Sequence, residues 1–162
     1  MNDLITKIVA WANARNLIKG SDVDTQLLKL LSEVGELADA VTKNDLDGIK
    51  DAIGDCFVVL TIVCEMSRDV DIPNNYDDLH IVRVRKMVCS LGDVVAKMAH
   101  DVSNYRVKVF VNKLRAIAIC YGFTLQECVQ SAYDEIKHRK GIMHNGVFIK
   151  ESDPMYKELT SD

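Results

Sequence analysis

Two pairs of carboxylates stand close together between residues 27 and 64. Glu33 and Glu36 are three residues apart, and Asp51 and Asp55 are four residues apart. In a helix, both spacings place the two side chains of a pair on one face. A short polar break separates the pairs, so the pattern predicts two facing helices that bring the four carboxylates together. We interpret them as a cage for a divalent metal ion.

The ligand type indicates which metal such a cage would hold. Carboxylate oxygens are hard ligands that suit Mg²⁺, and also Mn²⁺, better than a soft or tetrahedral metal, and Mg²⁺ typically binds substrate phosphates as well. The alternative is that the acids form solvated helix faces matched by nearby lysines. Gly35 and Gly54 accompany the pairs, although each costs about 1 kcal/mol relative to alanine in a helix. Both glycines therefore favour closely packed backbones and a site.

Polar and basic side chains lie where a polyphosphate could be held by such ions. A polar stripe borders the apolar seam of the helix predicted from residue 24 to about residue 43, and it comprises Gln26, Lys29, Glu33 and Glu36. Sites between helices are lined at such edges. Three cations expected in the final turn of the last helix are further candidates: Lys137, Arg139 and Lys140. We expect Trp11 to pack in the core, with stacking on a nucleobase as the minority interpretation.

Composition and charge restrict the class of protein. The chain has 162 residues, of which 48% are apolar and 27% charged, as in an ordinary helical domain. A net charge of −4 without a dominant basic stripe argues against a nucleic-acid partner. No signal pattern is visible, and the longest apolar run falls far short of the roughly 20 residues that span a bilayer. We therefore expect a cytoplasmic protein without a membrane partner.

The five cysteines form no Cys-x-x-Cys pair, and the four histidines show no ligand spacing. This pattern favours reduced core thiols over a disulfide framework or a zinc site, and it makes the histidines surface or incidental residues.

Hydrophobic periodicity predicts an all-α helical bundle of about six helices in a single domain over residues 1–162. A first helix is expected over residues 3–17. The acid hairpin follows over residues 24–66, and its second helix is apolar on every side beyond Asp55, which predicts burial. The remaining segments are a linker over residues 68–78, a second hairpin over 79–121, and the last helix and tail over 124–162.

Local signals predict the details of the last segment. Thr124 and Glu127 have the spacing of a capping box, and the helix that they begin is expected to end at Gly141. His144-Asn145-Gly146 between apolar residues predicts a hairpin-like turn. Residues 152–162 are expected to be loosely held.

The second hairpin is a weak repeat of the first at a shift of 57 residues. Gly35 aligns with Gly92 and Glu36 with Asp93, whereas the other metal-type residues are replaced: Glu33 by Ser90, Asp51 by Lys108 and Asp55 by Asn112. We infer a degenerate duplicate that serves as scaffold and has lost the cage. The alternative is that any two helical hairpins of similar pattern align in this way. Exposed apolar seams on paired helices favour a homo-oligomer, most simply a dimer.

Three ordered segments resemble the MazG-like, all-α nucleotide pyrophosphohydrolases. They are Ser32-Glu33-Val34-Gly35-Glu36-Leu37, then Asp51-Ala52-Ile53-Gly54-Asp55, and last residues 132–141 with 145–150. The resemblance implies Mg²⁺-dependent hydrolysis of a nucleoside or deoxynucleoside triphosphate between the α and β phosphates, giving the monophosphate and pyrophosphate. One expectation for its role is house-cleaning of the nucleotide pool.

The resemblance also assigns roles to residues. It implies that Glu33, Glu36 and Asp55 bind metal and carry catalysis. Members commonly have Glu where this chain has Ala52, and Asp51 is the candidate substitute as a metal ligand. Ser32 stands where members often carry a further Glu, and Asp134 stands in place of an Asn that would help to bind substrate. The segment over residues 68–119 is longer than in compact members, so it is a candidate to supply helices that a partner subunit supplies there.

Two other functions remain open from the sequence. One is a related phosphohydrolase that acts on phosphoribosyl-ATP or another phosphorylated metabolite. The other is a catalytically weak nucleotide sensor or helical interaction module. This function stays open because Ser32 and Ala52 stand where members of the family often carry Glu.

Overall fold

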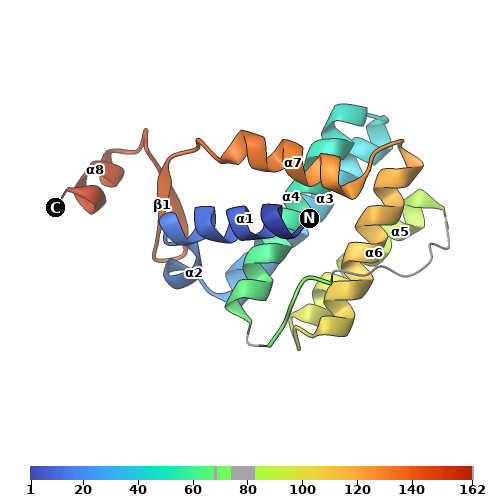
Figure 1. The fold of residues 1–162 in the computed structure, drawn as a ribbon, viewed down its shortest axis with the longest axis horizontal. Coiled ribbons are helices and arrows are strands. Elements are labelled where there is room, and N and C mark those ends of the chain that lie inside the picture. Colours follow the sequence, from blue (N-terminus) through green and yellow to red (C-terminus); the bar gives the residue numbers. More distant parts are fainter. Residues whose placement is uncertain (68, 74–82, 162) are drawn as a thin grey trace.

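The computed structural model describes residues 1–67, 69–73 and 83–161. It is an all-α bundle, as predicted, with eight helices and one two-stranded sheet in these residues (Figure 1). The two helices beyond the predicted six are short. In chain order the elements are α1 (Asn2–Ala14), α2 (Leu17–Gly20), α3 (Val23–Lys43), α4 (Leu46–Met66), α5 (Val84–Met98), α6 (Asn104–Cys120), α7 (Leu125–Ile136), β1 (Gly141–His144), β2 (Val147–Lys150) and α8 (Pro154–Thr160).

The acid hairpin is formed by α3 and α4, and the caps explain where these helices begin. The Asp22 carboxylate accepts the N–H of Thr25 at 2.7 Å, and the Asp45 carboxylate accepts the N–H of Gly48 at 3.1 Å. Asn44 has a φ of 53°, the left-handed conformation that ends α3 and reverses the chain within two residues. The predicted hairpin is therefore confirmed.

Helix α4 lies at the centre of the molecule. Every residue from position 56 to position 64 is buried, including Thr61, whose hydroxyl donates to the carbonyl of Phe57 at 2.8 Å. Helices α1, α3, α6 and α7 all pack against α4. The run of apolar residues beyond Asp55 thus has neighbours on every side, as predicted.

Helix α7 crosses α4 at Gly54. A Cβ atom at Gly54 would lie 2.7 Å from the Cβ of Ala132 and would overlap the carbonyl of Cys128, so this crossing requires glycine. At Gly35, by contrast, a Cβ atom would have no neighbour within 4 Å. The expectation that both glycines mark closely packed backbones is therefore confirmed for Gly54, which accommodates α7, and wrong for Gly35, which accommodates no neighbouring element.

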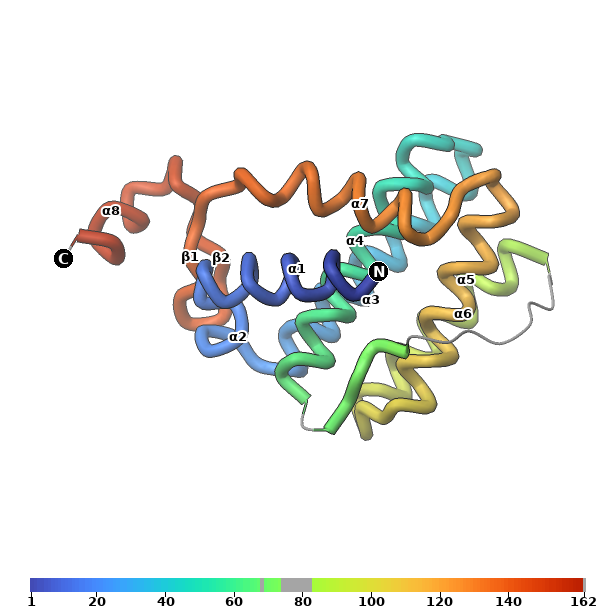
Figure 2. The backbone as a smooth tube through the Cα atoms, viewed as in Figure 1, coloured from blue at the N-terminus to red at the C-terminus, as the bar shows by residue number. Residues whose placement is uncertain are grey.

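Helices α5 and α6 form a second hairpin, and they pack on α3 and α4 respectively (Figure 2). Both helices lie within the range of the predicted hairpin, residues 79–121. The first four residues of that range lie outside the described part of the chain. Of the predicted linker, residues 69–73 are described and are not helical.

The last long helix is shorter than predicted, although its capping box at Thr124 and Glu127 is confirmed. It ends at Ile136 instead of Gly141, because side chains of the N-terminal segment take the carbonyls that a longer helix would use. The Trp11 indole N–H donates to the carbonyl of Ile136 at 2.8 Å, and the Arg15 guanidinium donates to the carbonyl of Arg139 at 2.7 Å. The basic residues 137–140 therefore follow the helix and do not form its final turn.

The first helix also ends earlier than predicted, at Ala14. Asn16 has a φ of 56°, which breaks the helix, and α2 begins directly after it.

The predicted hairpin turn is confirmed as the connection between β1 and β2. Asn145 and Gly146 have φ values of 48° and 77°, as a two-residue type I′ turn requires. The hairpin lies on the junction of α1 and α2: the N–H of Met143 donates to the carbonyl of Arg15 at 2.8 Å, and the N–H of Gly146 donates to the carbonyl of Gly20 at 3.1 Å. Residues near the two ends of the chain are thereby joined.

The tail beyond the hairpin has regular structure that was not predicted from the sequence. It forms α8, which is capped by Asp153 and has no buried residue. In Figure 1, α8 extends away from the body of the molecule.

The prediction of core thiols is right for Cys56, Cys64 and Cys128, whereas Cys89 and Cys120 are exposed, and all five thiols are free. The three histidines in the described residues are exposed, as expected, and His80 lies outside them. None of the helices described is both long enough and apolar enough to cross a membrane.

Candidate active site

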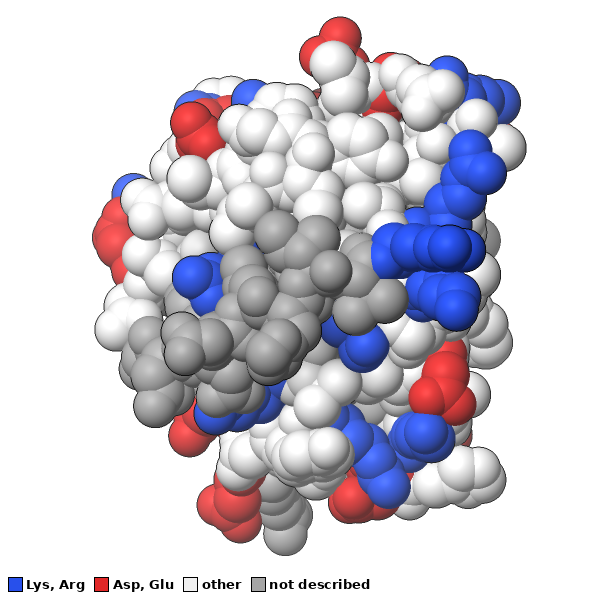
Figure 3. Space-filling view, turned by 90° about the vertical axis from the view of Figure 1, so that its right-hand side faces the viewer, with Lys and Arg blue, Asp and Glu red and all other residues white. Residues whose placement is uncertain are grey.

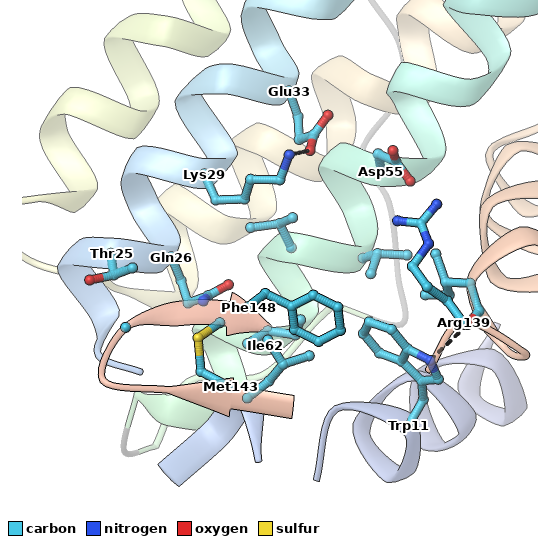
Figure 4. A pocket seen from close by; sticks show the side chains of 15 residues that line it. Trp11, Thr25, Gln26, Lys29, Glu33, Asp55, Ile62, Arg139, Met143 and Phe148 are labelled. Atoms are coloured by element: carbon cyan, nitrogen blue, oxygen red, sulfur yellow. Dashed lines mark hydrogen bonds and ion pairs between the residues drawn. The ribbon is translucent and has the colours of Figure 1, made fainter. Parts of the chain in front are cut away.

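A cavity of about 350 Å³ opens between α1, α3, α4, the end of α7 and the β-hairpin. Figure 4 shows that it has two ends of different character. The carboxylates of Glu33 and Asp55 lie at one end. Aromatic and aliphatic side chains line the other end, where the hairpin approaches α1 and α4.

Glu33 is a buried carboxylate, with 3% of its surface exposed. It forms an ion pair with the Lys29 ammonium one helical turn earlier on α3. A buried carboxylate without a partner would be very unfavourable. Lys29, whose side chain is about half exposed, therefore supplies the positive charge beside Glu33, and it lines the same cavity.

Asp55 has the most perturbed carboxyl group of the site. Burial is the main cause that raises its pKa to about 7, and the negative charges of Glu33, Asp51 and Glu135 raise it further. Lys29 opposes the shift without cancelling it. A cation placed beside Asp55 would stabilise the ionised form of its carboxyl group. A raised carboxyl pKa in a cavity is typical of functional sites.

Glu36 and Asp51 do not line this cavity. Both are exposed, and they line a shallow depression on the adjoining surface together with Ser32 and Ala52. They still interact electrostatically with the cavity acids: partial burial raises the pKa of Asp51 first, followed by the charges of Glu135 and Glu36. The four predicted acids are thus neighbours, but only two of them share the cavity.

The donor set fits a hard divalent cation in its chemistry. Carboxylate oxygens are the ligands that Mg²⁺ and Mn²⁺ prefer, and burial together with the neighbouring acids raises the pKa of Asp55, so a cation bound here would stabilise its ionised form. As placed, no three Asp, Glu, His or Cys side chains in the described ranges converge on one metal position. Glu33 and Asp55 are the residues that would hold a metal ion, with Glu36 and Asp51 as the adjacent carboxylates, and these ligand assignments stay predictions.

Three of the six predicted substrate-binding residues line the cavity, namely Gln26, Lys29 and Arg139. The other three lie elsewhere. Asp134 accepts hydrogen bonds from Lys137 at 2.7 Å and from Gln130 at 3.0 Å, and all three are exposed. Lys140 is paired with Glu151 at 2.9 Å. The structure does not bring Asp134, Lys137 and Lys140 to the site, because α7 ends before the last two.

Glu135 was not among the residues predicted from the sequence. This residue of α7 shares a side-chain hydrogen bond with Asp51, and it pairs with Arg139 at 2.6 Å. It brings a carboxylate from another helix to the acid hairpin, beside Asp51. The signal was the glycine at position 54, whose packing partner turned out to be α7.

Two side chains of the β-hairpin, Met143 and Phe148, were also not predicted. They are cross-strand partners and line the cavity. Trp11 packs against the core as expected, yet its ring also lines the cavity. The apolar residues on both sides of the Asn145-Gly146 turn were a signal for Met143 and Phe148, since a hairpin with apolar side chains is expected to bury a face.

The fold and the cavity define a helical protein with a carboxylate site between two antiparallel helices. Comparison with protein families is consistent with this description, because residues 21–88 match the model of the MazG nucleotide pyrophosphohydrolase domain. The resemblance predicted from the sequence is therefore confirmed for this stretch, which contains α3, α4 and the four predicted acids.

Over 67 residues, the chain is 46% identical to an uncharacterized 18.2 kDa protein from the rep-hol intergenic region of Haemophilus phage HP1 (strain HP1c1). The match covers 41% of this chain and 41% of that relative, which is less than half of either protein. No solved structure matches the chain.

Proposed function

We propose that the protein is a Mg²⁺-dependent nucleoside triphosphate pyrophosphohydrolase, which converts a nucleoside or deoxynucleoside triphosphate and water into the monophosphate and pyrophosphate. One observation carries the proposal. Glu33 and Asp55 face the same cavity within the stretch that matches the MazG domain, and the pKa of Asp55 is raised to about 7 there.

In this mechanism the carboxylates of Glu33 and Asp55 would hold a divalent ion, with Glu36 and Asp51 as the adjacent carboxylates. When bound, a divalent ion neutralises phosphate charge and lowers the pKa of a water molecule. The water oxygen forms a bond to the α phosphorus, and the bond from that phosphorus to the bridging oxygen breaks, so pyrophosphate leaves. Lys29 and Arg139 line the cavity and offset the charge that develops on the phosphates.

The ion pair between Lys29 and Glu33 gives Lys29 a second task. Its ammonium satisfies the buried Glu33 carboxylate, and its partly exposed side chain can reach an anionic substrate from the same position. Arg139 is held by Glu135 at 2.6 Å, which orients the guanidinium beside the cavity. Lys29 comes from α3 and Arg139 from the segment after α7, so the two cations reach the acid end from different parts of the chain.

A nucleotide sensor is the second candidate, and the arrangement of the acids favours it. In the part of the chain that the structure describes, no three ligand side chains converge, and two family acids are replaced by Ser32 and Ala52. A protein of this kind would bind nucleotide without turnover.

The test is an assay of pyrophosphate and of inorganic phosphate released from a panel of ribo- and deoxyribonucleoside triphosphates, with Mg²⁺, with Mn²⁺ and with EDTA. We expect release of pyrophosphate that requires the metal. Tight nucleotide binding without release of either product would support the sensor and contradict the enzyme. Turnover of phosphoribosyl-ATP alone, in a parallel assay, would support the related phosphohydrolase.

A further inference from the structure

The end of the cavity away from Glu33 and Asp55 is a compartment lined by aromatic and aliphatic side chains. Figure 4 shows the rings of Trp11 and Phe148 next to each other there, with Met143 and Ile62 beside them. The side chains come from α1, from the β-hairpin and from α4, so three separate parts of the chain enclose this end. Aromatic faces of this kind favour a planar ring as ligand.

The Gln26 side chain faces this compartment, and its carbonyl oxygen has no hydrogen-bond donor among the described residues. Gln26 lines the cavity and has 3% of its surface exposed. Its side-chain N–H donates to the hydroxyl of Ser21 at 3.0 Å, whereas no side chain or backbone group in the described residues donates to its Oε1.

The Oε1 atom of Gln26 is not fully buried. Among the described residues, it is not one of the fully buried side-chain atoms that lack a hydrogen-bond partner. It therefore stays accessible from the cavity that Gln26 lines. An amide oxygen that is open to the cavity and has no donor from the protein can accept a hydrogen bond from a donor on a ligand.

The compartment is built before any ligand arrives. The Trp11 indole is fixed by its hydrogen bond to Ile136, and the hairpin that carries Phe148 is fixed on the α1–α2 junction by hydrogen bonds of Met143. Gly141 leaves room for the Phe148 ring, which a Cβ atom at that position would overlap. Walls that are already ordered lose little entropy when a ligand binds.

We propose that this compartment binds the nucleobase of the substrate, an inference that rests on the function proposed above. The base lies against the rings of Trp11 and Phe148, and the Oε1 of Gln26 accepts an N–H of the base edge. The phosphates then extend toward Lys29 and Arg139 at the acid end of the cavity. Gln26 is thereby a specificity-determining residue, and a base with an N–H donor is preferred over a sugar phosphate that carries no base.

Binding can be measured without turnover by using the proposed products. Trp11 is the only tryptophan in the chain, so its fluorescence reports on this compartment alone. The probes are the four deoxynucleoside monophosphates with Mg²⁺, compared with deoxyribose 5-phosphate, which lacks a base. We expect at least one nucleotide to change the emission of Trp11 and deoxyribose 5-phosphate to leave it unchanged. Equal binding of deoxyribose 5-phosphate would overturn the proposal.

Variants test the individual contacts by calorimetry. Gln26→Leu keeps the volume but removes the acceptor, and we expect it to weaken binding of the preferred nucleotide about tenfold. Phe148→Ala should weaken it by a similar factor through lost stacking. Gln126→Leu is the matched control, because Gln126 is exposed on α7 and does not line this cavity. Unchanged affinity in both cavity variants would overturn the proposal.

An N-methylated base, tested on the parent protein and on Gln26→Leu, completes a thermodynamic cycle. This cycle distinguishes loss of one hydrogen bond from a general structural defect. Methylation of the donor nitrogen should weaken binding to the parent protein about tenfold and should have no further effect on Gln26→Leu. If Gln26→Leu does not fold, as judged by circular dichroism, the methylated base with the parent protein and Phe148→Ala decide the question. Equal loss in the parent protein and in Gln26→Leu would contradict the contact with Gln26.

The base site and the reaction can fail separately. Pyrophosphate release with an unchanged KM in Gln26→Leu and in Phe148→Ala would leave the reaction in place and remove the base site. Binding of monophosphates that depends on Gln26, without release of pyrophosphate from any triphosphate, would leave the base site in place and remove the reaction.

Discussion

The two helical hairpins of this protein have the same topology and opposite charge. The segment from α3 to α4 carries nine Asp and Glu residues and three Lys residues, whereas the segment from α5 to α6 carries two Asp residues and seven Lys and Arg residues. Figure 3 looks at the molecule from the side of α5 and α6, and Lys and Arg side chains gather on this face. The net charge of −4 for the whole chain conceals this separation.

The two hairpins differ in whether they contain carboxylates that are buried or have a raised pKa. In the first hairpin, Glu33 is buried and Asp55 has a raised pKa. At the corresponding positions of the second hairpin stand Ser90 and Asn112, which carry no charge. The Ser90 hydroxyl donates to the carbonyl of Met87 within its own helix, at 2.7 Å. A scaffold does not need buried carboxylates, and this hairpin has none of them at these positions.

The largest expected effect is on turnover. Asp55→Ala and Glu36→Ala should lower kcat by about 10³-fold or more with the helical fold intact, since each removes a carboxylate from the metal neighbourhood. Asp93→Ala changes the residue that corresponds to Glu36 in the second hairpin, and it should leave kcat unchanged. Pyrophosphate release measures the rate, and circular dichroism checks the fold. Retained activity in either cage variant would discredit the assignment.

A smaller but still large effect concerns the glycines. Gly54→Ala should lower the free energy of unfolding by about 3 kcal/mol, because the new methyl group meets α7. Gly92→Ala, in the second hairpin, meets no atom within 4 Å and should raise the free energy of unfolding by up to about 1 kcal/mol. Urea denaturation measures both. A mild effect of Gly54→Ala would show that α7 does not depend on this close approach.

The third effect is a dependence of stability on pH. Because the folded-state pKa of Asp55 is raised from 3.8 to about 7, the folded protein holds this proton longer than the unfolded chain does. The free energy of unfolding should therefore fall as pH rises from about 4 to 7 and then stay level. In the absence of metal, Asp55→Asn should gain about 2 kcal/mol at pH 8 and nothing at pH 4.

Urea denaturation at the two pH values measures this gain. Glu65→Gln, on an exposed residue at the other end of α4, is the control and should change stability equally at both pH values. An Asp55→Asn variant with the same stability difference at pH 4 and pH 8 would contradict the raised pKa.

The smallest effect concerns two ion pairs, one in each hairpin. Lys29 pairs with the buried Glu33, whereas Lys97 pairs at 2.7 Å with the exposed Asp93. Lys29→Met removes a cation that competes with metal for Glu33, and it should tighten Mg²⁺ binding without nucleotide about fivefold. Lys97→Met should leave Mg²⁺ affinity unchanged. Isothermal titration calorimetry measures both, and weaker Mg²⁺ binding in Lys29→Met would mean that Lys29 positions Glu33 instead of competing.

Periodicity and capping signals predicted most of the fold. The acid hairpin, the capping box at Thr124 and the Asn145-Gly146 turn depend on interactions within a few residues, and the helix after Asp55 is recognised by its continuous run of apolar residues. All four are confirmed. The end of α7 was missed because it depends on Trp11 and Arg15, more than 120 residues away. Local sequence patterns do not contain such a contact.

The candidate site was predicted in part for the same reason. Helical spacing places Gln26, Lys29 and Glu33 on one edge of α3, and the structure shows all three at the cavity. The expectation failed where it required a longer last helix, so Lys137 and Lys140 lie outside the cavity. Glu135 and Phe148 were missed because their approach to the site depends on how α7 and the hairpin pack, which spacing along the chain does not specify.

The hydrogen bonds between the β-hairpin and the α1–α2 junction have a consequence for synthesis on the ribosome. The acids of α3 and α4 emerge from the exit tunnel early, whereas the wall that holds Met143 and Phe148 emerges some 80 residues later. A nascent chain can therefore carry the carboxylates before it has a compartment to select what they act on. Under the proposal that this compartment binds the base, the protein becomes selective only after the β-hairpin has been synthesised and has packed on α1 and α2.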